Sequence, residues 1–320
     1  MRVAGYGEAG TRGGGSVGPL CPTRMVARSG ATLLTKKTVF TNSTMADTTL
    51  KSIIDYLKTN RGVDFSGHRP SMVGRHVRQR LAALKCKNYN EYFRLIQEND
   101  SELDSLIDVL TINVSRFFRN ALTFEYFTDK VLPVIVHRKA DAGDRSLRIW
   151  STACSTGEEP YSVAIIVNEF LKKENIDLTL NIFATDIDDR AIESAKRGIY
   201  PLESVENIKY RLLRRYFIAD GEFFKLGSRI KDLVMFTHYD ILDERRYVPS
   251  ESVFGNFDIV LCRNLLIYFN IASQERIFGK LHHALADDGC LILGEAEAPT
   301  GKYQKRFRKI NDCCHIYGKS

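Results

Sequence analysis

The pattern of apolar and polar residues divides the chain near position 145. From about residue 46 to 140 the apolar residues recur at helical spacing, as Leu50, Ile53 and Leu57 do in "TTLKSIIDYLKTN". Four more helical stretches follow: "RPSMVGRHVRQRLAALKCK" with Pro70 in its first turn, "NYNEYFRLIQEN", "DSELDSLIDVLTIN" capped by Asp100 or Ser101, and "ALTFEYFTDKVLPVIVHRK". This part predicts a small all-helical domain.

Beyond the polar linker "ADAGDRS", strands alternate with helices. The predicted strands are "LRIWST", "LTLNIFATDID", "FDIVLCRN" and "CLILGEAE". The predicted helices are "PYSVAIIVNEFLKK", "DRAIESAKRGIY", "SVENIKYRLLRRYF" and "ASQERIFGKLHHALADDG". A β-rich stretch, "GEFFKLGSRIKDLVMFTHYD", lies before the third strand, and "RFRKINDCCHIYGK" predicts a closing hairpin. The alternation indicates an α/β fold with a mostly parallel, doubly wound sheet.

Composition and charge separate residues 1–44 from the rest. The net charge of the 320-residue chain is +7, and residues 1–44 hold six Lys or Arg against Glu8, which leaves only +2 for the rest. No nucleic-acid partner is therefore indicated. The segment is rich in Gly, Ser and Thr and predicts disorder. It lacks the apolar core of a signal peptide, whereas an organelle presequence fits its composition. The favoured interpretation is that synthesis truly begins at Met45.

The cysteines and the apolar runs exclude several other classes of protein. Seven cysteines without a CxxC pair predict neither a disulfide framework nor a zinc site, so we expect no metal and a reducing, cytoplasmic location. No apolar run approaches the roughly 18–20 residues of a membrane-spanning helix, and we expect no direct membrane insertion.

The first strand of the α/β part leads into a turn with an unusual charge. In "WSTACSTGEEPYSVAI" (150–165) a single glycine, Gly157, replaces the GxGxxG of dinucleotide folds, and Glu158 and Glu159 would repel a pyrophosphate. A cationic ligand such as S-adenosylmethionine, with its sulfonium and ammonium groups, fits better. Asp186 and Asp188 end the next strand, where an acid accepts ribose hydroxyls. Alternatively, the two glutamates only cap the helix and interact with its dipole.

Five segments, in order, resemble the chemotaxis receptor glutamate O-methyltransferases (CheR family). They are "TINVSRFFRN" (111–120), "WSTACSTGEEPYSVAI" (150–165), "ATDIDDRAIESAKRGIY" (184–200), "FDIVLCRNLLIYFN" (257–270) and "DGCLILGEAEA" (288–298). The resemblance covers about residues 45–320. It implies a Rossmann-like S-adenosylmethionine-dependent methyltransferase domain at 146–320, with a β-subdomain at about 218–237. An all-helical domain at 45–125 and a linker helix and linker at 126–145 would precede it.

The resemblance also implies a cofactor, a reaction and a partner. The enzyme would methylate glutamate side chains on the cytoplasmic helical domain of methyl-accepting chemoreceptors and release S-adenosylhomocysteine. Because a glutamate side chain has a pKa near 4.3, it is ionised at pH 7 and needs no general base. Catalysis would come from in-line alignment and desolvation of the two charges.

Individual residues receive roles from the matching motifs. Cofactor contacts are implied for Asn113, Ser115 and Arg119 at the domain junction, Glu159 at the methionine ammonium, Asp186 at the ribose, Asp240 and Ile241 at the adenine, and Cys262 and Arg263 near the methionine end. Arg119, Arg263 and Tyr268 are the candidates for orienting the acceptor carboxylate. Many members of the family have threonine at the position of Ser115, which keeps the hydroxyl, and asparagine at the position of Asp240, where this chain departs from the family.

Each role has a structural alternative. Arg119 could form an interdomain salt bridge, Tyr268 could be a core aromatic, and the thiol of Cys262 could lie in the core, leaving only its backbone at the site. The basic helix face of Arg69, Arg75 and Arg78 would meet the acidic receptor, or would simply be solvated. The short β-subdomain favours an enzyme that needs no receptor-tail tether.

Three other functions stay open at this point. A methyltransferase-like adaptor would bind receptors without turnover, but the presence of Glu159, Asp186, Arg263 and Tyr268 disfavours it. A nicotinamide-dependent oxidoreductase on the same fold is disfavoured by the lone glycine and the paired acids. A methyltransferase with a different protein acceptor is compatible with every motif.

Overall fold

A computed structural model of the chain describes residues 35–111, 114–252 and 255–320, and for residues 35–47 it describes the backbone alone. Residues 46–320 form one unit, to which the following description refers. Of the segment predicted to be disordered, residues 1–34 lie outside the described residues. Helix α1 (Thr35–Arg61) covers residues 35–44, because neither glycine nor proline interrupts the chain between Gly30 and Gly62.

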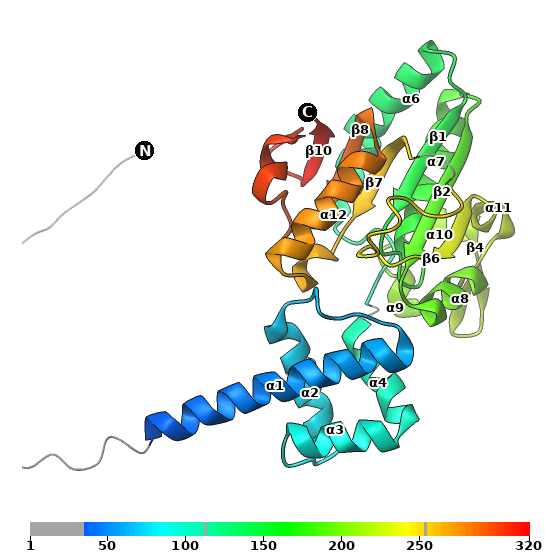
Figure 1. Cartoon of the computed structure of the whole chain (residues 1–320). Coiled ribbons are helices and arrows are strands. Elements are labelled where there is room, and N and C mark those ends of the chain that lie inside the picture. Colours follow the sequence, from blue (N-terminus) through cyan, green and yellow to red (C-terminus); the bar gives the residue numbers. More distant parts are fainter. Residues whose placement is uncertain (1–34, 112–113, 253–254) are drawn as a thin grey trace, which may run out of the picture. The chain divides into compact units, whose positions relative to one another are not determined.

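Four helices make up the first domain (Figure 1): α1, α2 (Pro70–Ala83), α3 (Tyr89–Glu98) and α4 (Asp100–Thr111). Their core is formed by buried Ile53, Leu57, Val73, Tyr92, Leu103 and Leu106. The predicted cap of α4 at Asp100 or Ser101 is wrong. Asn99 takes that place, since its side-chain oxygen accepts a hydrogen bond from the Glu102 amide at 3.2 Å.

The connection to the second domain is a helix with an irregular middle. It comprises α5 (Ala121–Tyr126), the π-helical turn η1 (Phe127–Val131) and α6 (Leu132–Asp141). The sequence predicted one uninterrupted helix here. Pro133 has no amide hydrogen to donate, and the wider turn directly before it accommodates the missing bond.

The central sheet has seven strands in the order β6-β2-β1-β7-β8-β10-β9. They are β1 (Ser146–Ser151), β2 (Thr179–Asp186), β6 (Val234–His238), β7 (Phe257–Cys262), β8 (Leu285–Leu293), β9 (Phe307–Lys309) and β10 (Ile316–Lys319). The strands from β6 to β8 pair in parallel, while β8, β10 and β9 pair antiparallel. This confirms the predicted mostly parallel, doubly wound sheet and the closing hairpin.

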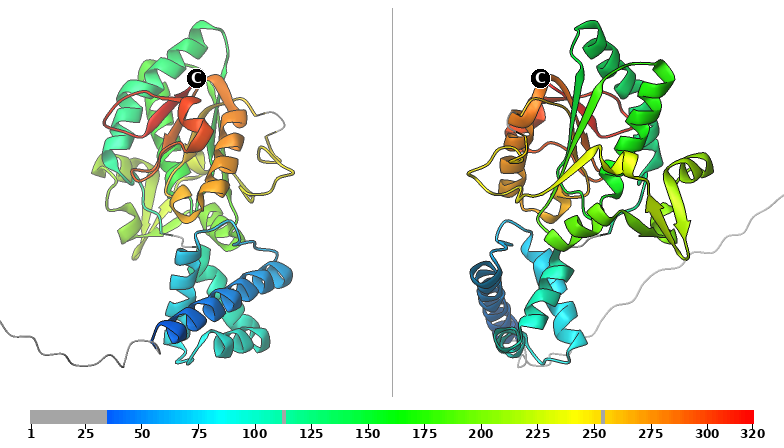
Figure 2. Two further views of the ribbon diagram at one scale, coloured as in Figure 1. Left: turned by 60° about the vertical axis from the view of Figure 1, so that its left-hand side comes forward. Right: turned by 90° about the vertical axis from the view of Figure 1, so that its right-hand side faces the viewer.

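Alternating side chains give the sheet two apolar faces. Ile149 packs on one face with α6 and α7 (Glu158–Glu174), and the adjacent Trp150 packs on the other with α12 (Ile271–Ala284). The views in Figure 2 show α7 and α12 on opposite sides of the sheet. Helix α8 (Asp189–Arg197) follows β2.

A second sheet of three strands, β3-β5-β4, forms the β-subdomain. Its strands are β3 (Ile199–Pro201), β4 (Phe217–Asp220) and β5 (Phe223–Leu226), and the short helices nearby are α9 (Leu202–Val205), α10 (Tyr210–Tyr216) and α11 (Ser228–Lys231). The subdomain was expected at about 218–237, but its strands lie within 199–226. Residues 234–238 instead form β6, which pairs along the outer edge of β2 and satisfies the backbone groups there.

The two domains are joined by backbone hydrogen bonds near the carboxyl ends of the parallel strands. The Arg69 amide donates to the carbonyl of Tyr268 at 2.8 Å, and the Asn270 amide donates to the carbonyl of Gly67 at 3.0 Å. Tyr268 ends the short helix η2 (Leu266–Tyr268), and its side chain packs against the helical core. Gly67 has no room for a side chain, because a Cβ there would lie 2.6 Å from Leu242.

Candidate active site

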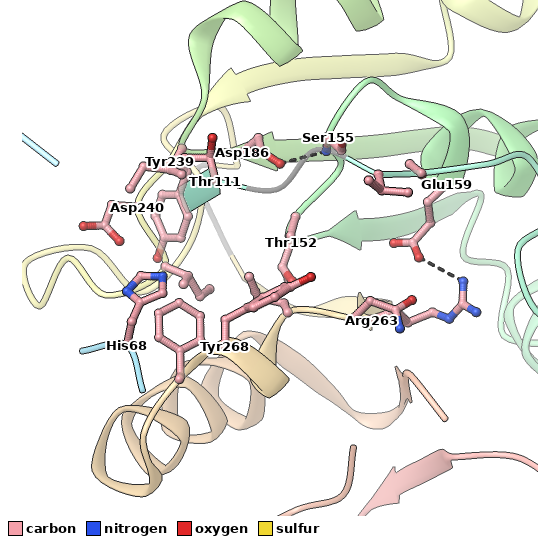
Figure 3. A pocket seen from close by; sticks show the side chains of 18 of the residues that line it. His68, Thr111, Thr152, Ser155, Glu159, Asp186, Tyr239, Asp240, Arg263 and Tyr268 are labelled. Atoms are coloured by element: carbon pink, nitrogen blue, oxygen red, sulfur yellow. Dashed lines mark hydrogen bonds and ion pairs between the residues drawn. The ribbon is translucent and has the colours of Figure 1, made fainter. Parts of the chain in front are cut away.

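A pocket opens at the carboxyl ends of the parallel strands, where the strand order reverses between β1 and β7 (Figure 3). Open α/β sheets bind their ligands at such a switch point. The helical domain supplies part of the wall, namely Asp64, Phe65, His68, Leu110 and Thr111. Both domains therefore build one site.

An ion pair occupies one end of the pocket. Glu159, in the first turn of α7, lies 3.1 Å from Nη1 of Arg263, and its other oxygen accepts a hydrogen bond from Ser151 at 2.9 Å. Burial raises the pKa of Glu159, and the charge of Arg263 opposes that rise. Nη2 of Arg263 donates to the Arg119 carbonyl and to the Asn120 side chain. This end offers a carboxylate and a guanidinium side by side.

The adjacent Glu158 does not line the pocket. Its carboxylate accepts hydrogen bonds from Thr156 at 2.7 and 2.9 Å and from Ser204 at 3.5 Å, and burial raises its pKa. Ser115 also hydrogen-bonds this carboxylate, which lowers its pKa. Of the two acids in the first turn, only Glu159 is therefore available to a ligand, and Glu158 fixes the surrounding loops.

Asp186 ends β2 in the middle of the pocket. Its two oxygens accept the amides of Ser155 at 2.7 Å and of Asp188 at 3.0 Å, and burial raises its pKa. The Asp188 side chain instead caps α8 by accepting the amides of Arg190 and Ala191. Asp186 is thus the acid that faces a ligand at this strand end.

The far end of the pocket combines the 239–242 segment with the helical domain. Asp240 accepts the Leu242 amide at 2.8 Å, burial raises its pKa, and buried Ile241 lies beside it. His68 faces this end between two aromatic rings, with centroid distances of 5.0 Å to Phe65 and 4.5 Å to Phe269. Burial lowers the pKa of His68 to about 4, so its ring is neutral at pH 7.

His68 was not singled out from the sequence. The only signal is its place in "VDFSGHRP", a short interruption between two helical patterns that combines aromatic and polar residues. Its position in the wall results from the joint between the domains, which no local pattern reveals.

The structure brings together most of the residues singled out from the sequence. The pocket is lined by Ser115, Arg119, Glu159, Asp186, Asp240, Ile241, Arg263 and Tyr268. Cys262 is fully buried in the core beneath it, where burial raises the pKa of its thiol. Asn113 lies outside the described residues. The Nη1 of Arg119 donates to the Val114 carbonyl at 3.0 Å, and none of the ion pairs found in the described parts of the chain involves Arg119.

The three arginines of the predicted substrate face lie outside the pocket wall. Arg75 and Arg78 are exposed on α2, and Arg78 donates to the Tyr89 hydroxyl at 3.2 Å. The Nε of Arg69 donates to the Phe269 carbonyl at 3.1 Å, so this residue also belongs to the domain joint.

The charges and free polar atoms of the pocket suit S-adenosylmethionine. Its wall carries four acids and three arginines, namely Asp64, Glu159, Asp186, Asp240, Arg116, Arg119 and Arg263. Within the described residues, Oγ of Ser155 and Nε of Arg263 are buried without a hydrogen-bond partner. Such atoms normally have one, and a bound ligand would supply it. The excess of acid disfavours a pyrophosphate and suits a cation.

Two features are absent from the described ranges. Those residues include no cluster of three or more His, Cys, Asp or Glu side chains arranged to hold a metal ion. Among their helices, none has both the length and the apolar character needed to cross a membrane.

Comparisons with known proteins give matches along most of the chain. Residues 48–111 match the model of the CheR methyltransferase all-alpha domain, and residues 113–314 match that of the CheR methyltransferase SAM binding domain. Chemotaxis protein methyltransferase 2 of Vibrio cholerae is 33% identical over 275 residues, which cover 83% of this chain and 92% of that protein. The chemotaxis protein methyltransferase of Escherichia coli is 30% identical, with 79% and 85% covered. That of Borreliella burgdorferi is 28% identical, with 79% and 88% covered.

Proposed function

This chain belongs to the CheR family of S-adenosylmethionine-dependent methyltransferases, and from that premise we propose that it converts glutamate side chains of chemoreceptors to methyl esters in chemotactic adaptation. One observation carries the proposal. The Glu159–Arg263 ion pair lies at one end of a two-domain pocket that Tyr268 and Arg119 also line. A zwitterionic amino-acid group and an incoming carboxylate can both be bound there.

The pocket residues divide the cofactor among them. Bound S-adenosylmethionine supplies a methyl group activated by a sulfonium. We assign its ammonium to Glu159, its carboxylate to Arg263 and its ribose hydroxyls to Asp186, and we place its adenine along Asp240 and Ile241. We assign Ser115, Arg119 and Asn113 to the side of this site that faces the domain junction. Cys262 contributes through its backbone, since its thiol is in the core.

The reaction requires orientation more than proton transfer. A glutamate carboxylate with a pKa near 4.3 is already an anionic nucleophile at pH 7. Arg119, Arg263 and the hydroxyl of Tyr268 would direct it in line with the methyl group. Closure of the site by the helical domain would remove water from both reacting charges, which favours their combination.

The acceptor would approach along α2. The residues directly before this helix, Gly67 and Arg69, form the domain joint beside the pocket, and Arg75 and Arg78 are exposed further along the helix. A glutamate-rich helix of a receptor's cytoplasmic domain would be attracted to this basic face. The enzyme would accordingly work in the cytoplasm, and its small β-subdomain would not need a receptor-tail peptide.

Alkali sensitivity of the transferred methyl group tests the proposal. Methyl-labelled S-adenosylmethionine is incubated with receptor-containing membranes or receptor fragments, and the labelled protein is then treated with mild alkali. Release of the label as volatile methanol is expected, since carboxyl methyl esters hydrolyse. Alkali-stable label would place the methyl group on another atom. Cofactor binding without any transfer, across receptors of the native cell, would favour the adaptor function instead.

A further inference from the structure

The carboxylate of Glu297 binds four backbone amides next to the active site. One oxygen accepts from Asn264 at 2.8 Å and Gly294 at 2.7 Å, and the other accepts from Leu266 at 2.7 Å and Ile267 at 3.3 Å. The residue is only 3% exposed. A buried carboxylate is tolerated when hydrogen bonds replace its hydration, and charge-assisted bonds of this kind are strong. Glu297 therefore fixes the backbone from Asn264 to Ile267.

The surroundings of this carboxylate are closely packed. A Cβ on Gly294 would lie 2.6 Å from Oε2 of Glu297 and 2.9 Å from the Asn264 amide. Within the same region, Nε2 of Gln274 donates to the carbonyls of Leu266 at 2.9 Å and Phe269 at 3.2 Å. Amides and carbonyls of the segment 264–269 are thus held by two buried side chains.

The held segment ends in the part of the site where the two domains meet. Tyr268 lines the pocket, and its carbonyl accepts the Arg69 amide of the helical domain. Arg263, directly before the segment, has anchors of its own in Glu159, the Arg119 carbonyl and Asn120. A loss of the Glu297 bonds would consequently loosen the backbone that leads into Tyr268 and leave the side-chain anchors of Arg263 in place.

We propose that Glu297 is a positioning residue for methyl transfer, which holds Tyr268 at the reacting methyl group through the backbone of residues 264–267. The inference rests on the function proposed above for Tyr268. It assigns Glu297 no contact with the cofactor or the acceptor. A displacement of about 1 Å at a reacting centre can lower a rate by about 100-fold, so the effect should be seen in kcat.

Glu297→Gln is the first test, because the amide keeps the size of the side chain but turns one acceptor into a donor facing two amides. We expect kcat to fall about 10- to 100-fold, while the Kd for S-adenosylhomocysteine, measured by calorimetry, changes less than about threefold. The double variant Glu297→Gln with Tyr268→Phe should have a kcat only slightly below that of Tyr268→Phe alone, since Glu297 acts through Tyr268.

Asp258→Asn is the matched control. Asp258 is a buried carboxylate near the amino end of β7, whereas Glu297 binds the backbone just beyond the carboxyl end of that strand. Asp258 binds Lys139 and the Arg148 amide, each at 2.8 Å. The Asp258→Asn substitution should lower thermal stability without a comparable loss of kcat. Equal losses of kcat in the two variants at matched loss of stability would show a merely structural role and would overturn the proposal. Full additivity with Tyr268→Phe would overturn it as well.

Hydrogen exchange gives a readout that does not depend on turnover. Exchange of the amides of residues 264–267 should accelerate in Glu297→Gln, while that of β2 around Asp186 should not. Gly294→Ala, which pushes on the same bonds from the other side, should act in the same direction if Glu297→Gln fails to fold. Unchanged exchange in both would contradict the inference. Alkali-stable label in the wild-type reaction would refute only the glutamate acceptor. It would not refute the role of Glu297, because the ratio of kcat between Glu297→Gln and wild type can be measured on any acceptor.

Discussion

At the scale of single residues, two adjacent glutamates have different tasks. Glu159 faces the pocket and pairs with Arg263, whereas Glu158 is bound to Thr156 and Ser204. We expect Glu159→Gln to weaken binding of S-adenosylmethionine by about 10- to 100-fold, the value of one charged hydrogen bond. Glu158→Gln should lower stability and leave the affinity within about threefold. Calorimetric titration of both variants decides this, and equal losses of affinity would contradict it.

His68 makes stability dependent on pH. Burial lowers its pKa from 6.5 to about 4, against the raising effects of a hydrogen bond to the Phe65 backbone and the charge of Asp64. As pH falls below 6.5 the unfolded chain takes up the proton first, so stability is lost between pH 6.5 and pH 4. Between pH 7 and pH 5, the titration of His68 should lower the free energy of unfolding by at most about 2 kcal/mol.

Urea unfolding of wild type and His68→Phe at pH 7 and pH 5 measures this contribution. The variant keeps an aromatic ring between Phe65 and Phe269 but does not titrate, so its stability should fall less on acidification. An identical pH dependence in both proteins would mean that the ring is hydrated in the folded state.

Sequence reasoning can place a residue at the pocket where its side chain comes at or directly after the end of a strand. Asp186 ends β2 and Arg263 directly follows β7, and parallel strands bring their carboxyl ends to one edge. His68 and Glu297 could not be found in this way. The first reaches the pocket only through the domain joint, and the second acts on backbone amides about 30 residues earlier in the chain.

At the scale of elements, the turn between β1 and α7 depends on Gly157. Its φ is +93°, and a Cβ there would lie 2.8 Å from Ala195 and 3.1 Å from the Tyr200 hydroxyl. Gly143 also has a positive φ of +71°, but open space surrounds it. Gly143→Ala should therefore cost about 1 kcal/mol of unfolding free energy from backbone strain alone.

Gly157→Ala should cost about 2 to 4 kcal/mol, because overpacking adds to the strain. It should also weaken binding of S-adenosylhomocysteine, since the same turn places Ser155 and Glu159. Urea unfolding and calorimetry of the two variants measure both effects. A similar cost for the two substitutions would mean that Ala195 and Tyr200 move aside freely.

Most elements follow from periodicity, and the exceptions share one cause. The parallel strands are apolar on both faces and the helices on one, which a local window detects. The assignment of residues 234–238 to the central sheet depends on the unpaired edge of β2, a partner far away in the sequence. Pro133 marks a break that the sequence shows, but the continuation of the helix through a π-helical turn, instead of an end there, depends on the packing of α6 against the sheet.

At the scale of the whole molecule, the basic face of α2 is expected to guide the acceptor. Arg75→Glu combined with Arg78→Glu should raise the KM for receptor about tenfold and reduce its sensitivity to salt, because an exposed attraction becomes a repulsion. The affinity for cofactor should stay unchanged. Lys305→Glu with Arg308→Glu, an exposed pair near the C-terminal hairpin, serves as the control. An equal rise in KM for both pairs would indicate an effect of net charge alone.

Because the pocket takes its walls from both domains, a bound cofactor should stabilise the helical domain as well as the sheet. S-adenosylhomocysteine at 100-fold its Kd adds about 2.7 kcal/mol to the free energy of global unfolding. Beyond that common effect, the amides of residues 64–69, including that of Arg69 bound to Tyr268, should gain protection from hydrogen exchange. Helix α3 contributes nothing to the pocket wall and should gain no more than the common effect. If the strand ends gained protection from hydrogen exchange and residues 64–69 did not, the methyltransferase domain would bind the cofactor alone. The helical domain would then be confined to contact with the receptor.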